Sequence, residues 1–387
     1  MTTFIEDSPR SLSGWIIEAS NAGHATAAVL TPWATPLAHR GGAGKKPGIA
    51  NHAEKLTEAG VPFWFDATTH ALQMTGVGDF RYYAEYNLWG GPMGDLSQGA
   101  YRREHVERVF ERQREIGAPY LAPTILLPSG LNNLSTLALE TAKSALDLQP
   151  AAWLSLSGIG TLWGDGRDLD AHIGAMSALC PDGWFVSIVQ PQSDLPPRLT
   201  AEEVFGICRT VRALSEYAPV HISHGDFAAL PAVAAGATSV GTGWDKRQRV
   251  VSYKDYGPRP EKAGQAQWYQ HPAFLGLLGT LAKGEGELLE QQDRILTSRL
   301  GGLPALPQVK YYYLQHVSQL SAAMRQIQST GSNYKKRFEQ LDDMYLNATT
   351  NWRSIQTSAG LPDRSNFWIE PYHEGLRMYA KSEGWIA

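Results

Sequence analysis

The stretch Pro219–Arg249, PVHISHGDFAALPAVAAGATSVGTGWDKRQR, decides the fold. It predicts a strand over Val220–Ser223, a short apolar helix over Phe227–Ala235 and a second strand over Thr238–Gly241. Gly236 follows the helix, at the position where a glycine commonly ends one. Two strands joined by a helix in this way run parallel and form a βαβ unit. A helix this short and apolar is expected to pack against the sheet and against little else.

The same alternation of strand and helix extends toward the N-terminus. Apolar segments that predict further strands are Ala25–Leu30, Pro62–Phe65, Tyr120–Leu127, Ala151–Ser157 and Trp184–Val189. One of the intervening helices begins at Thr200, with Glu203 three residues later, which is the pattern of a capping box. Alternation of this kind is typical of a parallel sheet that is covered by helices.

We therefore predict an α/β fold, a (β/α)8 barrel of the TIM type with a C-terminal helical appendage. Seven strands are clear, so an open doubly wound sheet is the alternative, and the eighth barrel strand is expected at Trp15–Ile17 or beyond residue 250. No dinucleotide-binding glycine pattern follows the first clear strand, which disfavours a Rossmann domain. The predicted domains are an N-terminal lead-in over 1–23, the barrel over 24–260 and the helical appendage over 261–387.

Composition narrows the class of protein. The 387-residue chain has a formal net charge of −4, so no global charge favours nucleic acid or a membrane surface. Its two cysteines are too few for a disulfide framework or a four-cysteine zinc site. The first residues lack the layout of a signal peptide, and no apolar run approaches the roughly 20 residues of a membrane span. A cytoplasmic protein without membrane contact is the prediction.

In a barrel of parallel strands, the carboxyl ends of the strands meet on one face, where ligands bind. The residues expected at this mouth are Thr31, Asp66, Thr69, His70, Thr124, Ser157, Gln190, Gln192, His224, Asp226 and Asp245. Asp66 follows an apolar strand, so its carboxylate is expected to be partly desolvated and to act as a base or nucleophile. The alternative is that Asp66 caps the next segment.

His224 and Asp226 belong to a single turn, Ser-His-Gly-Asp. A histidine beside a carboxylate suits proton transfer. The same pair, together with Asp66 and His70, is also able to form a metal site, although the spacing matches no metal signature. A purely structural turn is the third interpretation. His221 lies within the preceding strand and is expected to be a core or barrel-lumen residue.

The loop after the last strand of the βαβ unit is rich in glycine and positive charge. Its residues are Gly241, Gly243, Trp244, Lys246, Arg247 and Arg249. In barrels, loops at this place often hold phosphate on backbone N–H groups, and aromatic rings among basic residues suit stacking on a base. A solvated basic loop, with aromatic packing between barrel and appendage, is the alternative.

Two pieces of the chain, Phe63–Asp66 and Ala232–Arg249, resemble tRNA-guanine transglycosylases and their DNA-acting relatives. The resemblance implies a (β/α)8 barrel that exchanges a nucleobase through an aspartate nucleophile. It also implies that the aspartate delivered by the early strand, here Asp66, reads the base.

The chain departs from that family at three places. The glycines that follow the early aspartate in the family are replaced by Ala67–Thr69. Gly241 stands where the nucleophilic aspartate is expected, and the nearest carboxylate is Asp245. No cysteine follows Cys208, so the three-cysteine zinc site of the family is missing.

These observations together predict a barrel enzyme that acts on a nucleobase or nucleoside, by base exchange on tRNA or DNA. The favoured class is a transferase of the transglycosylase kind. The predicted catalytic residues are Asp66, Asp245, His224 and Asp226. The predicted substrate-binding residues are Thr69, His70, Gln190, Gly241, Gly243, Trp244, Lys246, Arg247 and Arg249.

No cofactor is predicted, with zinc or another divalent metal as the lesser alternative. The other functions that the sequence leaves open are a metal-assisted hydrolase and a non-catalytic subunit that binds nucleic acid or protein. A homodimer or a protein partner would be bound through the C-terminal helices.

Overall fold

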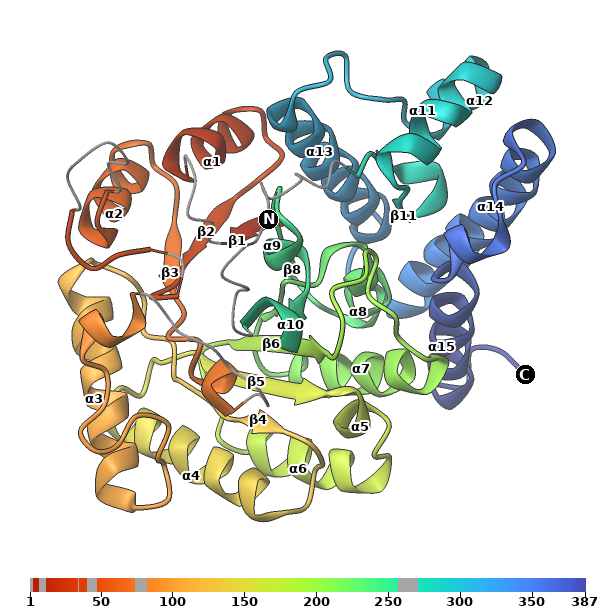
Figure 1. Ribbon diagram of the computed structural model, residues 1–387. Coiled ribbons are helices and arrows are strands. Elements are labelled where there is room, and N and C mark those ends of the chain that lie inside the picture. The colour runs from red at the N-terminus through yellow and green to blue at the C-terminus, as the bar shows by residue number, and fades with distance from the viewer. Residues whose placement is uncertain (1–2, 7–11, 34, 40–46, 74–81, 257–270) are drawn as a thin grey trace.

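The computed structural model describes residues 3–6, 12–33, 35–39, 47–73, 82–256 and 271–387. Within them, eight parallel strands form one curled sheet in the order β3-β2-β1-β8-β7-β6-β5-β4 (Figure 1). The strands are β1 (Thr3–Glu6), β2 (Ala27–Leu30), β3 (Phe63–Phe65), β4 (Leu126–Leu127), β5 (Leu154–Ile159), β6 (Trp184–Gln190), β7 (Val220–Ser223) and β8 (Ser239–Thr242). The predicted barrel of the TIM type is confirmed, and the strand order excludes the doubly wound alternative.

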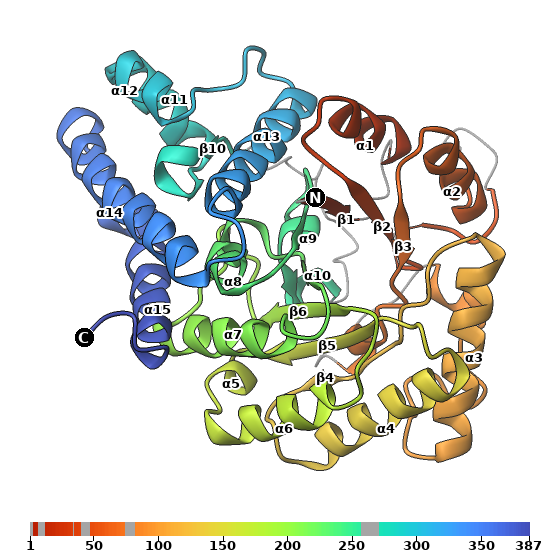
Figure 2. The same cartoon turned by 180° about the vertical axis from the view of Figure 1, so that it is seen from behind.

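Helices surround the sheet, as the two views of Figures 1 and 2 show. They are α1 (Leu12–Asn21), α2 (Ile49–Glu58), α3 (Gly99–Glu115), α4 (Asn133–Leu148), α5 (Gly160–Trp163), α6 (Arg167–Ser177), α7 (Ala201–Leu214) and α8 (Leu230–Ala235). The capping box predicted at the start of α7 is present, because the Thr200 hydroxyl accepts the Glu203 N–H and the Glu203 carboxylate accepts the Thr200 N–H. These helices cover the outward-facing apolar side chains of the strands.

The eighth barrel strand is β1, not either of the predicted segments. Thr3–Glu6 pairs in parallel with β2 on one side and with β8 on the other. Trp15–Ile17 lies in α1 instead, and the strand found beyond residue 250, β9 (Val251–Ser252), pairs only with the last two residues of β6. The predicted lead-in over 1–23 therefore contains barrel elements. The predicted boundary at 260–261 lies outside the described residues.

The strand register arranges the inward-facing side chains of the barrel in rows. One row joins Ser155, Phe185, His221 and Ser239, and the next toward the carboxyl ends joins Ser157, Ser187 and Ser223. The first row belongs to an aromatic layer in which Phe4 and Phe185 contact the His221 ring. The barrel interior thus has an aromatic floor with small hydroxyl side chains above it.

The two edges of the sheet are joined by a side chain. Gln113 of α3 is fully buried and donates its amide N–H groups to the carbonyl of Phe65, 2.9 Å away, and to that of Leu121, 2.8 Å away. Its own amide oxygen accepts the Leu121 N–H at 3.1 Å. Leu121 precedes β4 and bridges Trp153 beside β5, so Gln113 spans the gap between the β3 and β4 sides of the barrel.

The C-terminal helices pack on one side of the barrel. They are α11 (Lys283–Gln292), α12 (Arg294–Leu300), α13 (Val309–Gln328), α14 (Tyr334–Ala359) and α15 (Ile369–Ser382). Helices α13 and α14 lie against α8, and α15 lies against α7 (Figures 1 and 2). Every residue of α8 is consequently buried, so this helix packs against more than the sheet.

The remaining short elements connect the barrel to these helices. They are α9 (Lys246–Arg249), α10 (Tyr253–Tyr256), β10 (Ala273–Phe274) and β11 (Gly279–Thr280). Across the part of the chain that the structure describes, none of the helices has both the length and the apolar character that crossing a bilayer requires.

Gln113→Ala is expected to destabilise the fold by about 2–4 kcal/mol, because it leaves two buried carbonyls and one N–H without partners. Urea denaturation measures the change. Gln291→Ala, on the exposed face of α11, is the matched control and should stay within about 0.5 kcal/mol of the unaltered protein. Equal stability of the two variants would contradict the role of Gln113 at the seam, the gap between the β3 and β4 sides of the barrel.

Candidate functional site

The carboxyl ends of β1, β3 and β7 bring five titratable side chains together. Asp66 lies close enough to Glu6, His70 and His221 to influence the pKa of each, and Glu6 in turn influences that of His224. All five side chains are buried. Three of them, Asp66, His70 and His224, are predicted site residues, whereas Glu6 is new and His221 was expected to be a core or barrel-lumen residue.

Asp66 directly follows β3 and turns the chain. Its Oδ1 accepts the N–H of Thr68 at 2.7 Å, and Thr68 has a φ of 49°. The alternative prediction was that Asp66 caps the next segment. The hydrogen bond from the Thr68 N–H is a capping contact of this kind. The tight turn that follows places His70 beside Asp66. Burial lowers the pKa of His70, and the Asp66 carboxylate partly offsets this effect, so the His70 imidazole is neutral near pH 7.

The turn after β7 is strained. Both His224 and Asp226 have positive φ values, 51° and 46°, which non-glycine residues rarely adopt. Nδ1 of His224 lies 2.7 Å from the Ser223 hydroxyl, whereas Asp226 points into a different network. The two residues therefore do not form the predicted acid–base pair, because the left-handed turn sends their side chains to different partners.

Glu6 at the end of β1 is the partner of His224. Its Oε1 accepts the Ser223 hydroxyl and the His224 N–H, both at 3.1 Å, and lies 3.5 Å from Nε2 of His221. Its Oε2 is buried without a hydrogen-bond partner among the described residues. Burial raises the pKa of Glu6, and the nearby His224 partly offsets the shift.

Gly241 makes room for this carboxyl group. A Cβ at position 241 would lie 1.9 Å from Oε1 of Glu6 and 2.7 Å from the backbone nitrogen of His224. The carboxyl of β1 thus occupies the space that a side chain on β8 would fill. Gly241 is therefore a packing requirement of the site, and substrate contact by Gly241 stays a prediction.

His221 forms the floor beneath Glu6, as expected for a lumen histidine. Its ring stacks on Phe4 with centroids 4.3 Å apart, and its Nδ1 lies 3.0 Å from the Ser239 hydroxyl. Burial lowers the pKa of His221 to about 3, despite the opposing effect of Asp66. The imidazole is therefore neutral at physiological pH.

Further polar groups that follow the strand ends lack hydrogen-bond partners among the described residues. Nε2 of His70 and Nε2 of Gln190 are buried and make no hydrogen bond with the described residues. Leaving such atoms unsatisfied typically costs about 1–3 kcal/mol each, so groups of this kind point to a ligand or to ordered water. Thr69, in contrast, already contacts Nε2 of His105 at 2.9 Å.

Asp226 belongs to a separate buried network. It accepts Nε–H of Arg249 at 2.9 Å, and its other oxygen lies 2.8 Å from Nε2 of His316 on α13. The hydroxyl of Thr242 joins the same group, at 3.0 Å from the His316 ring nitrogen. Burial alone would raise the pKa of Asp226, but Arg249 and His316 hold it well below its ordinary range.

Asp226 and Arg249 thus connect the barrel to α13, and both oxygens of Asp226 are engaged within the protein. Arg249 is only 3% exposed, so its guanidinium does not lie on the surface of the loop. Its Nη2 is buried without a hydrogen-bond partner among the described residues, and substrate contact by Arg249 stays a prediction.

The glycine-rich turn after β8 is held by Gln248. Its amide oxygen accepts the N–H groups of Trp244 at 2.8 Å and of Asp245 at 2.9 Å. A Cβ at Gly243 would lie 2.4 Å from this side chain. Two backbone N–H groups of the loop in which phosphate binding was predicted are therefore already used within the protein.

The charged residues of this loop also contact the protein. Asp245 caps α9 by accepting the Arg247 N–H at 3.4 Å, and the Arg247 guanidinium lies over the Trp33 ring, 4.7 Å from its centroid. Lys246 donates to the Ser193 carbonyl at 3.3 Å. Substrate binding by Lys246 and Arg247 stays a prediction, as does the nucleophilic role of Asp245.

Trp244 takes part in the aromatic packing that was the alternative to base stacking. Its ring meets Trp15 of α1 edge-on at 5.3 Å, and Trp15 stacks on Tyr313 of α13 at 5.5 Å. The predicted alternative of packing between barrel and appendage is therefore present, and stacking of Trp244 on a base stays a prediction.

The predicted metal alternative uses Asp66, His70, His224 and Asp226. Among the described residues, no three or more His, Cys, Asp or Glu side chains are grouped in a way that would hold a metal ion. The engagement of Asp226 with Arg249 and His316 removes one ligand from the proposed set.

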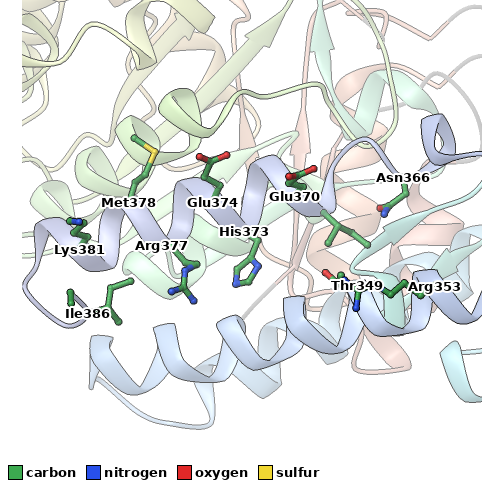
Figure 3. A pocket seen from close by; sticks show the side chains of 12 residues that line it. Thr349, Arg353, Asn366, Glu370, His373, Glu374, Arg377, Met378, Lys381 and Ile386 are labelled. Atoms are coloured by element: carbon green, nitrogen blue, oxygen red, sulfur yellow. The ribbon is translucent and has the colours of Figure 1, made fainter.

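A cavity of about 670 Å³ lies away from the barrel mouth, between α14 and α15. Figure 3 shows His373 and Arg377 on α15 directed toward α14, which carries Thr349 and Arg353. Asp342 lies 2.7 Å from Nε2 of His373 and 3.3 Å from Nη1 of Arg377. Side chains of both charge signs line the cavity.

No family model and no curated protein matches the chain. Among solved structures, a psychrophilic glycoside hydrolase family 10 endo-β-1,4-xylanase is 11% identical, with a TM-score of 0.34 and an alignment covering 67% of this chain and 94% of the xylanase. Eubacterium rectale Amy13B is 8% identical, with a TM-score of 0.38 over 84% of this chain and 78% of its own. Likeness at this level says nothing about activity, and the assignment to a barrel follows from the strand order itself.

Arg249→Met is expected to destabilise the fold by about 3–5 kcal/mol near pH 7, because it leaves the Asp226 carboxylate buried without its main partner. In the unaltered protein the folded-state pKa of Asp226 lies below the unfolded value, so this carboxylate stabilises the fold above its unfolded pKa and the contribution is lost as the pH falls. Without Arg249, burial raises the folded-state pKa of Asp226. Protonation of this carboxylate at lower pH therefore reduces the loss of stability in the variant.

The difference in unfolding free energy between Arg249→Met and the unaltered protein should therefore become smaller as the pH is lowered from 7 to 5, as measured by chemical denaturation. Arg209→Met removes a partly exposed pair with Asp170 and is the control, expected to cost no more than about 1 kcal/mol. A deficit for Arg249→Met that does not change with pH would contradict the assignment.

Proposed function

We propose that the chain is a barrel enzyme that acts at the glycosidic bond of a nucleobase-containing substrate, with Asp66 as the carboxylate that faces the anomeric carbon. The observation that supports it is the buried group of Asp66, Glu6 and neutral histidines at the carboxyl ends of the strands. Chemistry at glycosidic bonds commonly relies on a pair of carboxyl groups in different environments.

The unsatisfied groups at the mouth favour a flat heterocycle as part of the ligand. The Gln190 amide presents an unpartnered N–H group, and the neutral His70 ring presents a nitrogen without a partner. The edge of a nucleobase carries donors and acceptors side by side, which complements an amide and a neutral imidazole. In this arrangement Gln190 and His70 read the base, and Asp66 contacts the sugar in place of the base-reading role that the resemblance implies for it.

Base binding tests the proposal directly. Guanine or 7-deazaguanine at 100 times its Kd should stabilise the protein by roughly 2.7 kcal/mol, measured by thermal unfolding. Gln190→Leu should weaken this binding about tenfold, since it removes one hydrogen bond to the base, worth about 1.4 kcal/mol. Asp170→Asn, at a surface ion pair, is the matched control and should leave binding unchanged.

Exchange of a labelled base into tRNA or duplex DNA tests the chemistry. Asp66→Asn should retain base binding and lose at least about 100-fold in exchange rate, because an amide is neither a base nor a nucleophile. Asp245→Asn, tested in parallel, decides between the two predicted nucleophiles. Full exchange activity in Asp66→Asn, or no stabilisation of the unaltered protein by any base, would overturn the proposal.

A further inference from the structure

We propose that Glu6 is a second catalytic carboxyl group, which gives a proton to the nitrogen of the departing base. This inference rests on the proposed function and adds to it a residue on β1, the strand that the sequence did not reveal. It assigns the acid role to the end of β1 and leaves the attack on the sugar to Asp66.

The first support is the way in which the Glu6 carboxyl group is held. Oε1 is fixed by the Ser223 hydroxyl and the His224 N–H, each 3.1 Å away. Oε2 is buried and has no partner among the described residues. One oxygen is therefore oriented by the protein, and the other is left for a group that the protein does not supply.

The second support is the space around this carboxyl group. The bare Cα of Gly241 lets Glu6 approach β8, where any side chain would collide with Oε1 at 1.9 Å. The neighbouring inward positions on β5, β6 and β7 carry only the small side chains of Ser157, Ser187 and Ser223. Small residues beside a buried carboxyl group suit a site that receives a ligand.

The third support is the charge around Glu6. The titratable groups that influence it are Asp66, which disfavours a second negative charge, and His224, which favours one. His221 lies 3.5 Å from Oε1 and is neutral. Burial raises the pKa of Glu6 and outweighs the opposing effect of His224, so the Glu6 carboxyl group is suited to hold a proton.

The reaction balances with these two groups. An Asp66 oxygen bonds to the anomeric carbon as the carbon–nitrogen bond breaks, and the electron pair of that bond goes to the base nitrogen. That nitrogen takes the proton of Glu6. In the second half, Glu6 accepts a proton from the incoming base as its nitrogen attacks the anomeric carbon and the bond to Asp66 breaks.

The test uses a base that needs no acid to leave. The positively charged base of a 7-methylguanine nucleotide departs as a neutral molecule, whereas guanine requires protonation. Glu6→Gln keeps the size of the side chain but holds no transferable proton. It should retain base affinity and lose at least about 100-fold in the release of guanine from an oligonucleotide, while release of 7-methylguanine stays within a few-fold of the unaltered protein.

Gly241→Ala provides a second variant that displaces the carboxyl group without removing it. It should show the same selective loss, whereas Gly14→Ala, with open space at its Cβ, should not. Equal slowing with both bases, or no slowing with guanine, would overturn the acid role of Glu6 and leave the proposed function standing. Failure of the unaltered protein to bind or release any base would instead overturn the proposed function, and the acid role with it.

Discussion

A carboxyl group that is removed from water must find partners inside the protein, and this constraint shapes the mouth of the barrel. Glu6 satisfies one oxygen with groups from the end of β7. The Glu6 carboxyl group reaches these groups only because the neighbouring position on β8, Gly241, has no side chain. The strained backbone of His224 follows from the same requirement, since its N–H must point at the carboxyl oxygen. Three strands are thus organised around one buried acid.

The C-terminal helices are part of this construction and not an addition to it. Asp226 lies two residues beyond His224, and its charge is compensated by Arg249 from the following loop and by His316 from α13. Because a buried carboxylate without these partners would be costly, the turn that holds His224 depends on a helix that follows the barrel in sequence. The barrel mouth and the helical appendage therefore share one electrostatic network.

Much of the fold follows from local sequence patterns. Apolar strands such as Phe63–Phe65 and the capping box at Thr200 depend only on neighbouring residues, so the sequence was sufficient to predict them. Thr3–Glu6 was missed because it has only four residues and ends in an acid, so it was interpreted as part of a polar lead-in. Its inward residues, Phe4 and Glu6, nevertheless alternate with Thr3 and Ile5, as a barrel strand requires. A strand that short is recognisable only once its neighbours are known.

The site was harder to predict than the fold, because it depends on contacts between distant segments. Asp66, His70 and His224 were identified from their places after strands, but the pairing of His224 with Asp226 was wrong. The local sequence does not show that both residues have positive φ values. Nor does it show that His224 contacts Glu6 whereas Asp226 contacts His316. The burial of Arg249 was equally hidden, since it depends on a helix about 60 residues later in the chain.

The amide of Gln113 has a consequence for how the barrel tolerates change. A ladder of backbone hydrogen bonds fixes the alignment of two strands along their whole length, whereas one side chain fixes only the points that it touches. At the seam between the β3 and β4 sides, Gln113 binds Phe65 and Leu121, and Oε1 of Gln73 accepts the Leu126 N–H at 2.9 Å. Changes to these two amides are therefore expected to loosen the seam while the backbone ladders between the other strands stay intact.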